Sequence, residues 1–181
     1  GHLLVAQAAL EEIRLDRLLF IPAAQSPFKP GTNPTPAATR LRLLRMALAG
    51  RAEFEVDDQE VARGGVSYSI ETVRHVAARH PDATLFWLIG ADHVAALPQW
   101  RESGELARLI QFVVIPRPGV TAVEPPVPFR LQHLQGWPLK VSASEIRERA
   151  RNGRSIRHLV PSHVAEVIES EGIYRDRTRG N

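Results

Sequence analysis

The first residues of the chain could bind a phosphate group. Gly1-His2 directly precedes an amphipathic segment with the periodicity of a helix. The start of a helix carries unpaired N–H groups and a partial positive charge, and both attract a phosphate. His2 could add a hydrogen bond to a phosphoryl oxygen, or Gly1-His2 could be a frayed terminus without a role. The residues alone leave both interpretations open.

A second candidate site follows the most apolar run of the sequence. Residues 85–89 are all apolar, Gly90 comes next, and Asp92 stands two residues later. Glycine lets a ligand approach the backbone closely, and Asp92 could bind a hydroxyl or an amine of a nucleotide. Asp92 could equally cap the next helix. Trp100 could stack on a flat ligand, or it could pack against the interior.

Serine, glutamate and arginine near residue 145 have the spacing of a helix start beside a polyphosphate site. Ser142 and Glu145 form the S-x-x-E pattern of a capping box. Ser144, the free N–H groups of that helix start and Arg147 could together hold a polyphosphate. The alternative is an ordinary cap followed by a solvated arginine.

Two cations lie in or near a proline-rich segment, residues 22–38. Lys29 lies within this segment, and Arg40 belongs to the helix expected to follow it. A long loop of this kind often carries function, and either cation could reach over a bound phosphate as the loop closes. Both side chains could instead be solvated, one on a loop and one on a helix face.

Helices that alternate with short strands are expected to position these residues. Hydrophobic periodicity and capping residues predict helices at residues 3–13, 39–49, 69–79, 144–152 and 162–171. Short apolar runs predict strands at residues 18–21, 54–57, 85–89 and 112–115, and a poor strand at 129–134. Such alternation predicts an α/β fold, a parallel sheet with helices on both faces.

Two further expectations follow from this pattern. Residues 85–89, apolar at every position, are expected to form a central strand that is buried on both faces. Ser69 is expected to cap the helix that follows it. Ligands of a parallel sheet bind at the carboxyl ends of its strands, which is where Gly90 and Asp92 would lie.

Composition and charge limit the class of protein. Cysteine is absent, which excludes disulfides, thiolate metal sites and a cysteine nucleophile. The net charge is only +3, from 23 basic and 20 acidic residues that are interspersed, so charge does not favour nucleic acid as a partner. No apolar run approaches the roughly 20 residues that span a bilayer, and we see no export signal. We therefore expect one cytoplasmic domain over residues 1–181 without a membrane partner, and a homo-oligomer stays open.

Taken in order, these stretches resemble the bacterial nicotinate-nucleotide adenylyltransferases, a family of the nucleotidyltransferase superfamily. Gly1-His2 matches the end of that family's G-G-x-F-D-P-x-H-x-G-H motif, and VSASEIR at residues 141–147 matches its I-S-[SA]-[ST]-x-I-R signature. Further matches in chain order are PAAQSPFK at 22–29, the helix at 39–48, DQE at 58–60 with SYSIET at 67–72, LIGADHVAALPQW at 88–100, and residues 159–174. Each motif is short, but together they span the chain in the family's order.

The resemblance implies a Rossmann-like nucleotidyltransferase fold and a reaction. The family transfers the adenylyl group of ATP, bound with Mg²⁺, to nicotinate mononucleotide, and the products are nicotinate adenine dinucleotide and pyrophosphate. The residues implied to bind ATP and its phosphates are Gly1, His2, Gly90, Asp92, Ser142, Ser144 and Arg147. Those implied to bind the mononucleotide are Lys29, Tyr68, Ser69, Asp92, Trp100 and Arg101.

By the same resemblance, the roles of these residues differ. His2, Lys29 and Arg147 would act at the phosphates during catalysis, and Trp100 would stack on the pyridine ring. Backbone N–H groups near Ser69 and Arg101 would read the ring carboxylate. No side-chain metal site is expected, and either Ser142 or Ser144 could touch phosphate.

The resemblance also implies a segment that these residues do not include. In the family, a first β-strand and the G-x-F-D-P-x-H loop stand before the position of Gly1. Without that strand, the sheet is expected to leave apolar faces and backbone groups unpaired. Other acceptors, nicotinamide mononucleotide or phosphopantetheine, stay open, although Trp100 and residues 67–69 favour a pyridine nucleotide. A catalytically impaired nucleotide-binding module and a nucleic-acid-binding protein are the alternatives from other classes.

Overall fold

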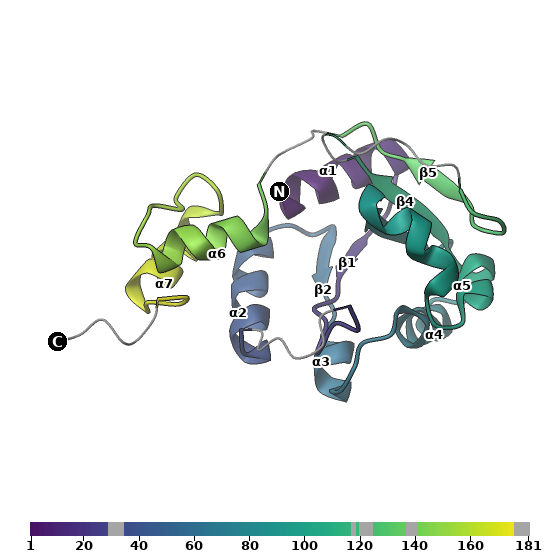
Figure 1. Cartoon of the computed structure of the whole chain (residues 1–181), viewed down its shortest axis with the longest axis horizontal. Coiled ribbons are helices and arrows are strands. Elements are labelled where there is room, and N and C mark those ends of the chain that lie inside the picture. The colour runs from purple at the N-terminus through teal and green to yellow at the C-terminus, as the bar shows by residue number, and fades with distance from the viewer. Residues whose placement is uncertain (29–34, 117–118, 120–124, 137–140, 176–181) are drawn as a thin grey trace.

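Short parallel strands and helices alternate along the chain (Figure 1). The structure, a computed structural model, describes residues 1–28, 35–116, 119, 125–136 and 141–175. Its helices are α1 (His2–Ile13), α2 (Ala37–Leu48), α3 (Gln59–Arg63), α4 (Ser69–Arg79), the 3₁₀ helix η1 (Ala91–Gln99), α5 (Ser103–Leu109), α6 (Ala143–Arg151) and α7 (Ser162–Ser170). Its strands are β1 (Leu18–Phe20), β2 (Phe54–Val56), β3 (Phe86–Gly90), β4 (Gln111–Ile115) and β5 (Leu131–His133).

The strands pair in parallel and form two sheets. β1 pairs with β2, and β3, β4 and β5 form a second sheet with β4 in the middle. Parallel neighbours need a crossover connection, which α2 supplies between β1 and β2. The predicted α/β fold with parallel strands is therefore confirmed. The strands divide into two sheets where one was expected, and a cavity lined by β1 and β3 separates them.

β4, rather than β3, is the strand that is covered on both faces. Phe112, Val113 and Val114 of β4 are at most 1 % exposed, whereas residues 86–88 of β3 are half-buried. β3 pairs with β4 along one edge, and residues 85–88 line the cavity. The expectation of a central strand at residues 85–89 is therefore wrong. An apolar run indicates that its side chains are kept from water, but it does not indicate how many strands pair with it.

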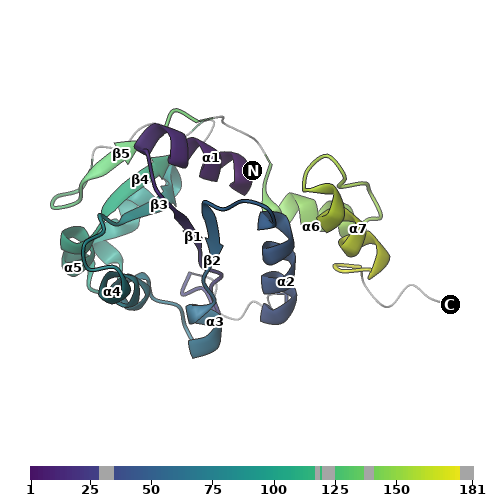
Figure 2. The same cartoon turned by 180° about the vertical axis from the view of Figure 1, so that it is seen from behind.

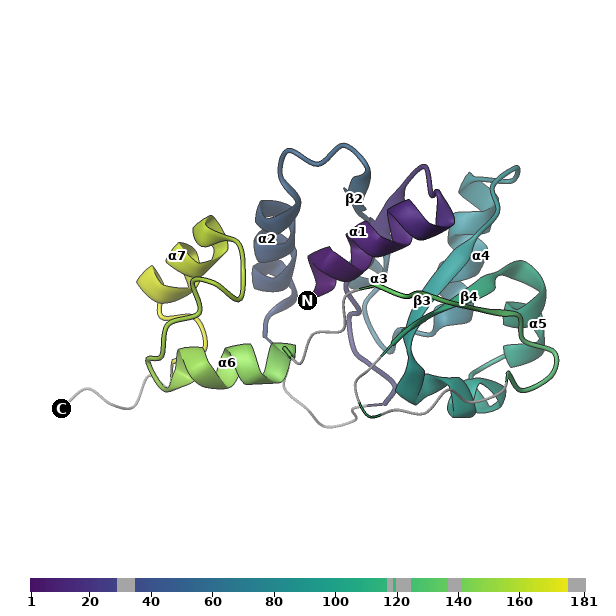
Figure 3. The same ribbon diagram turned by 90° about the horizontal axis from the view of Figure 1, so that it is seen from above.

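Helices cover both faces of the three-stranded sheet, as predicted. Successive side chains of β4 point to opposite faces. Val113 packs against Ala9 of α1, while Phe112 lies in a cluster with Ile70 of α4 and Leu106 of α5. Figure 3 shows α1 on one side of β4 and α5 on the other.

The C-terminal helices pack on α2 rather than on the larger sheet. Leu43 of α2 lies in one cluster with Ala150 of α6 and with Ala165 and Ile168 of α7. Figures 1 and 2 show α6 and α7 beside α2, at one end of the molecule. Leu48 of α2 belongs to a different cluster, with residues of α1 and β2. α2 therefore joins the smaller sheet to the C-terminal helices.

The sequence does not predict three short elements, α3, η1 and α5. α3 has five residues and α5 has seven, so neither shows two full turns of helical periodicity. η1 is a 3₁₀ helix that contains Pro98, and its residues follow a tighter repeat than the 3.6 residues of an α-helix. The predicted elements are all present, with ends that differ by at most two residues.

The start of α4 differs from the expectation. The helix begins at Ser69, and Tyr68 occupies the N-cap position in an extended conformation. The carbonyl oxygen of Tyr68 accepts the N–H groups of Glu71 and Thr72. Ser69 is therefore the first helical residue and not the cap, and it lines the cavity between the sheets.

Asp57, directly after β2, is a buried carboxylate that ties this strand to α4. Its oxygens accept the backbone N–H and the side-chain amide of Gln59, at 3.0 and 2.8 Å, and the guanidinium of Arg79. Burial by itself would raise the pKa of Asp57. The hydrogen bonds from Gln59 and the charge of Arg79 outweigh that effect and hold the pKa of Asp57 below its usual value.

We expect the substitution Asp57→Asn to lower the free energy of unfolding at pH 7 by about 1–3 kcal/mol, because it weakens charge-assisted hydrogen bonds to a buried group. The pKa of Asp57 is lower in the folded than in the unfolded chain. Its stabilisation is therefore complete above about pH 4 and is lost as the pH falls further. Urea unfolding of both proteins at pH 7 and pH 3 measures the effect. A difference of equal size at the two pH values would contradict a role for the charge.

Candidate active site

Two helix starts that are far apart in the sequence lie side by side. Gly1 is the N-cap of α1, and the helix begins at His2, one residue before the predicted start at residue 3. A Cβ atom added at Gly1 would lie 3.4 Å from the carbonyl oxygen of Val141, directly before the cap of α6. Figures 1 and 3 show the N-terminal end of α1 next to the start of α6. The structure therefore brings Gly1 and His2 together with the 141–147 motif.

The serines and the arginine of this motif have different partners. Ser142 is the N-cap of α6, and its Oγ accepts the N–H of Glu145 at 3.1 Å, which confirms the predicted cap. Ser144 is exposed, and its Oγ accepts a hydrogen bond of 3.0 Å from Nη2 of Arg147. Ser142 thus supports the helix, while Ser144 and Arg147 form a pair at its first turn. We call these residues, with Gly1 and His2, the helix-start site.

A second group of candidate residues meets at the start of α4. The guanidinium of Arg101 lies over the ring of Tyr68, 4.5 Å from its centroid. Nη1 of Arg101 also donates to Oε1 of Glu71 at 3.4 Å. These contacts hold residues 100 and 101 against the start of α4, where Ser69 is the first helical residue. We call this group, with Trp100, the aromatic site.

Trp100 belongs to an aromatic cluster that joins a buried ring, Phe112, to an exposed ring, Phe28. Its ring meets the buried ring of Phe112 edge-on, with centroids 6.0 Å apart. On another side Trp100 meets Phe28, also at 6.0 Å, and Phe28 meets His93 at the same distance. Nε1 of Trp100 is buried and has no hydrogen-bond partner within the described residues. The two interpretations of Trp100, packing and an aromatic surface for a ligand, are therefore compatible.

Gly90 and Asp92 lie at the carboxyl end of β3, as the sequence predicts. Gly90 is the last residue of β3 and the N-cap of η1. Asp92 therefore lies inside the first turn of η1 and does not occupy the cap position, which was the alternative interpretation. Its Oδ2 lies 3.8 Å from Nε2 of His93, the residue that contacts Phe28. Asp92 is thus connected to the aromatic cluster around Trp100.

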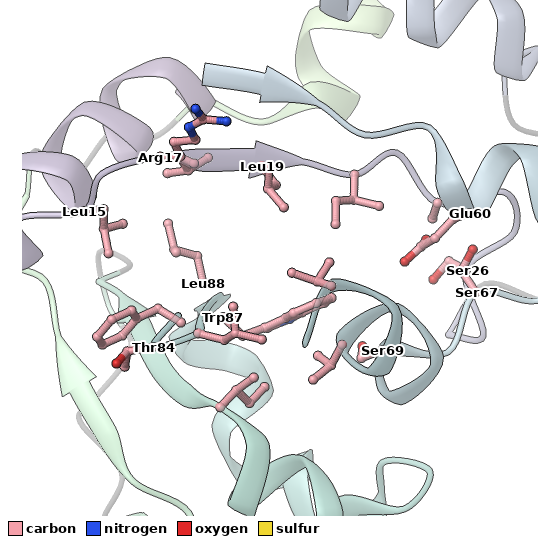
Figure 4. A pocket seen from close by; sticks show the side chains of 18 of the residues that line it. Leu15, Arg17, Leu19, Ser26, Glu60, Ser67, Ser69, Thr84, Trp87 and Leu88 are labelled. Atoms are coloured by element: carbon pink, nitrogen blue, oxygen red, sulfur yellow. The ribbon is translucent and has the colours of Figure 1, made fainter. Parts of the chain in front are cut away.

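A cavity of about 430 Å³ separates the two sheets. Figure 4 shows Leu19 of β1 and Leu88 of β3 on opposite sides of it, and Ser26, Glu60 and Ser67 together at one end. Glu60 at this end is buried, and its Oε1 accepts the hydroxyl of Thr72 at 2.5 Å. Ser69 of the aromatic site lines the cavity at the same end. Along β1 and β3 the lining is mostly apolar, as expected for a sheet that is interrupted between these strands.

The structure describes only one of the two candidate cations in or near the proline-rich segment. Lys29 lies outside the described residues. The guanidinium of Arg40 donates from Nη1 to the carbonyl oxygen of Ala23 at 2.6 Å and from Nε to that of Thr35 at 2.9 Å. Arg40 is therefore not simply a solvated side chain, because three of its N–H groups donate to backbone carbonyls, and its role as a phosphate ligand stays a prediction.

The sequence did not predict three contacts that shape these sites. Phe28 is 58 % exposed and contacts Trp100, Arg40 binds the loop that carries Phe28, and Arg101 covers Tyr68. Each of these contacts joins residues that are distant in the sequence. No local pattern reports such a contact, although the PAAQSPFK motif already includes Phe28.

The described residues hold neither a ready-made metal site nor a membrane-spanning helix. No three His, Cys, Asp or Glu side chains gather there in a way that could hold a metal ion. No helix in that part of the chain is long and apolar enough to cross a membrane.

Residues 1–149 match the protein family described as cytidylyltransferase-like. A relative from Gemmatimonas aurantiaca, named "Probable nicotinate-nucleotide adenylyltransferase", is 43 % identical over 100 % of this chain and 89 % of its own length. A relative of the same name from Geobacillus kaustophilus is 40 % identical over 98 % of this chain and 81 % of its own length. The chain belongs to the cytidylyltransferase-like family and, within it, to the nicotinate-nucleotide adenylyltransferases.

The fold is also similar to that of a solved structure. This structure is a Plasmodium falciparum nicotinic acid mononucleotide adenylyltransferase complexed with NaAD. The TM-score is 0.72, and the match covers 96 % of this chain and 88 % of that chain at 15 % sequence identity. The likeness supports the Rossmann-type α/β fold described above.

The partners of Ser142 and Ser144 predict different effects on stability. We expect Ser142→Ala to lower the free energy of unfolding by about 1 kcal/mol, because it removes the side-chain cap of α6. Ser144→Ala, the matched control two residues later, should change it by less than about 0.5 kcal/mol. Urea unfolding of the two variants measures both values. Equal losses would contradict the assignment of Ser142 as the cap.

Proposed function

We propose that this chain catalyses adenylyl transfer from ATP to nicotinate mononucleotide. A phosphate oxygen of the mononucleotide attacks the α-phosphorus of ATP, and the bond from that phosphorus to the α,β-bridging oxygen breaks. Nicotinate adenine dinucleotide forms and pyrophosphate leaves. The observation that carries the proposal is the meeting of two helix starts beside the pair formed by Ser144 and Arg147. The names of the relatives support the choice of substrates.

The helix-start site is proposed to bind the triphosphate of ATP. The N–H groups at the start of α1 and in the first turn of α6 provide donors with partial positive charge. His2 and Arg147 add side-chain donors, and Ser144 and Ser142 lie in the same segment. Phosphoryl transfer needs alignment and charge neutralisation more than covalent help. The attacking phosphate is already mostly ionised at pH 7, so no strong general base is required.

The aromatic site is proposed to bind the mononucleotide. Trp100 would stack on the pyridine ring, and the N–H groups near Ser69 and Arg101 would bind the ring carboxylate. Tyr68 supports Arg101 through the contact between their side chains. Gly90 and Asp92, at the carboxyl end of β3, are proposed to contact the nucleotide, and Lys29 is proposed to reach the phosphates.

The metal is proposed to be Mg²⁺ that enters with ATP. The described residues offer no cluster of three side-chain ligands, whereas Mg²⁺ in such sites is held largely by substrate phosphates and water. When bound, the ion neutralises charge on the phosphate oxygens. Arg147 and the two helix starts complete that neutralisation from the protein side.

The proposal also covers the organisation of the protein and its compartment. We propose that residues 1–181 act as one nucleotidyltransferase domain, since α2 links the C-terminal helices to the smaller sheet. We propose the cytoplasm as the compartment, in line with the expectation from the sequence.

A product assay tests the reaction and the acceptor together. The chain, with ATP and Mg²⁺ at constant ionic strength, receives nicotinate mononucleotide or nicotinamide mononucleotide, and the dinucleotide is separated and quantified. We expect product from the acid form, with little from the amide, because the donors near Ser69 and Arg101 favour a carboxylate. Product from the amide alone would reassign the acceptor. Absence of product from either, also after a family-type strand and G-x-F-D-P-x-H loop are added before Gly1, would overturn the proposal.

The role of His2 is tested by its removal. We expect His2→Ala to lower kcat by about 10²–10³-fold, because it removes one donor to the charge that develops at the α-phosphorus. His75→Ala, at an exposed position of α4, is the matched control and should leave kcat unchanged. A His2→Ala variant with the rate of the wild type would remove His2 from the mechanism.

A further inference from the structure

The guanidinium of Arg40 binds one side of the segment that carries Phe28. Arg40 lies in the first turn of α2, and its three nitrogen atoms all donate to backbone carbonyls. Nη1 and Nη2 reach the carbonyl oxygens of Ala23 and Ala24 at 2.6 and 3.4 Å, and Nε reaches that of Thr35 at 2.9 Å. Arg40 therefore joins two points of the backbone that are about a dozen residues apart.

The same segment is bound on its other side by the strand-like residues before α4. Oγ of buried Ser67 accepts the N–H of Ala24 at 2.9 Å, and the N–H of Ser67 donates to the carbonyl of Gln25 at 2.9 Å. Gln25 also forms a parallel bridge with Val66. Residues 23–25 are thus held between α2 and the start of α4.

This arrangement explains how an exposed phenylalanine stays beside Trp100. Phe28 is 58 % exposed, so its burial contributes little to holding the segment in place. The centroid of its ring lies 6.0 Å from those of Trp100 and His93. Fixing the backbone of several residues costs entropy, and the hydrogen bonds at residues 23–25 offset that cost. The position of Phe28 therefore depends on Arg40 and Ser67 more than on its own packing.

We propose that Arg40 is a positioning residue for the aromatic site. It acts through its hydrogen bonds to the carbonyl groups of Ala23, Ala24 and Thr35. These bonds fix the backbone that leads to Phe28, and so place Phe28 beside the ring of Trp100. This inference rests on the proposed function, because it assigns the mononucleotide to that site. A planar guanidinium can donate to several acceptors in fixed directions, and an ammonium group cannot reproduce this pattern. The geometry, and not the charge alone, is what Arg40 supplies.

Kinetics with Arg40→Ala and Arg40→Lys separate these two contributions. In both variants we expect kcat/KM for nicotinate mononucleotide to fall about 10- to 100-fold, as misplacement of a binding group does, with KM for ATP within about twofold of the wild type. Arg42→Ala is the matched control on the same helix, since Arg42 is exposed and pairs with Glu171 near the other end of the chain. Recovery of activity in Arg40→Lys would overturn the proposal, because a lysine restores a charge near phosphate but not the three hydrogen bonds. An equal rise of both KM values would overturn it as well.

Amide hydrogen exchange tests the same contacts without activity. We expect the N–H of Ala24 to exchange at least about tenfold faster in Arg40→Ala than in the wild type or in Arg42→Ala, with global unfolding unchanged. Unchanged exchange would show that Arg40 does not hold the segment, whatever the kinetics. If exchange rises but the wild type forms no dinucleotide, the proposed function fails, and the catalytic role of Arg40 fails with it while its hold on residues 23–25 remains.

Discussion

Parallel pairing around β4 is the constraint on which the arrangement of the rest depends. A strand that runs parallel to its neighbour is reached by a crossover, so successive strands end at the same edge of the sheet. Burial of β4 on both faces requires α1 on one side and α4 and α5 on the other. Gly90 consequently ends β3 beside the end of β4, and η1 begins at the edge where the carboxyl ends of these strands meet.

α1 connects the two sheets across the cavity between β1 and β3. Its alanines are buried on both sides of that boundary: Ala6 packs with residues of α2 and β2, and Ala9 packs with Val113 of β4. Small side chains let the helix approach both sheets closely. The same helix begins at the helix-start site, so the contact that joins the sheets also fixes where His2 lies.

Polar contacts between distant segments complete the sites. Arg40 and Ser67 hold the residues that lead to Phe28, and Arg101 rests on Tyr68. In each case a charged or hydroxyl group binds the backbone or an aromatic face of a segment that is distant in the sequence. Loops of this kind gain order from a few directed interactions rather than from the core.

The sequence by itself determined the helices and strands whose signals are local. Ser142 and Glu145 are three residues apart, so their cap could be predicted, and the same holds for the periodicity of α7 and the apolar residues of β4. The ordered motifs also pointed to the family that the comparisons established. Only the tertiary structure decided that β4 is the central strand, that Arg40 binds backbone carbonyls, and that Arg101 covers Tyr68. These outcomes depend on which segments pack side by side, and that choice is made by the burial of all elements together rather than by any stretch of neighbouring residues.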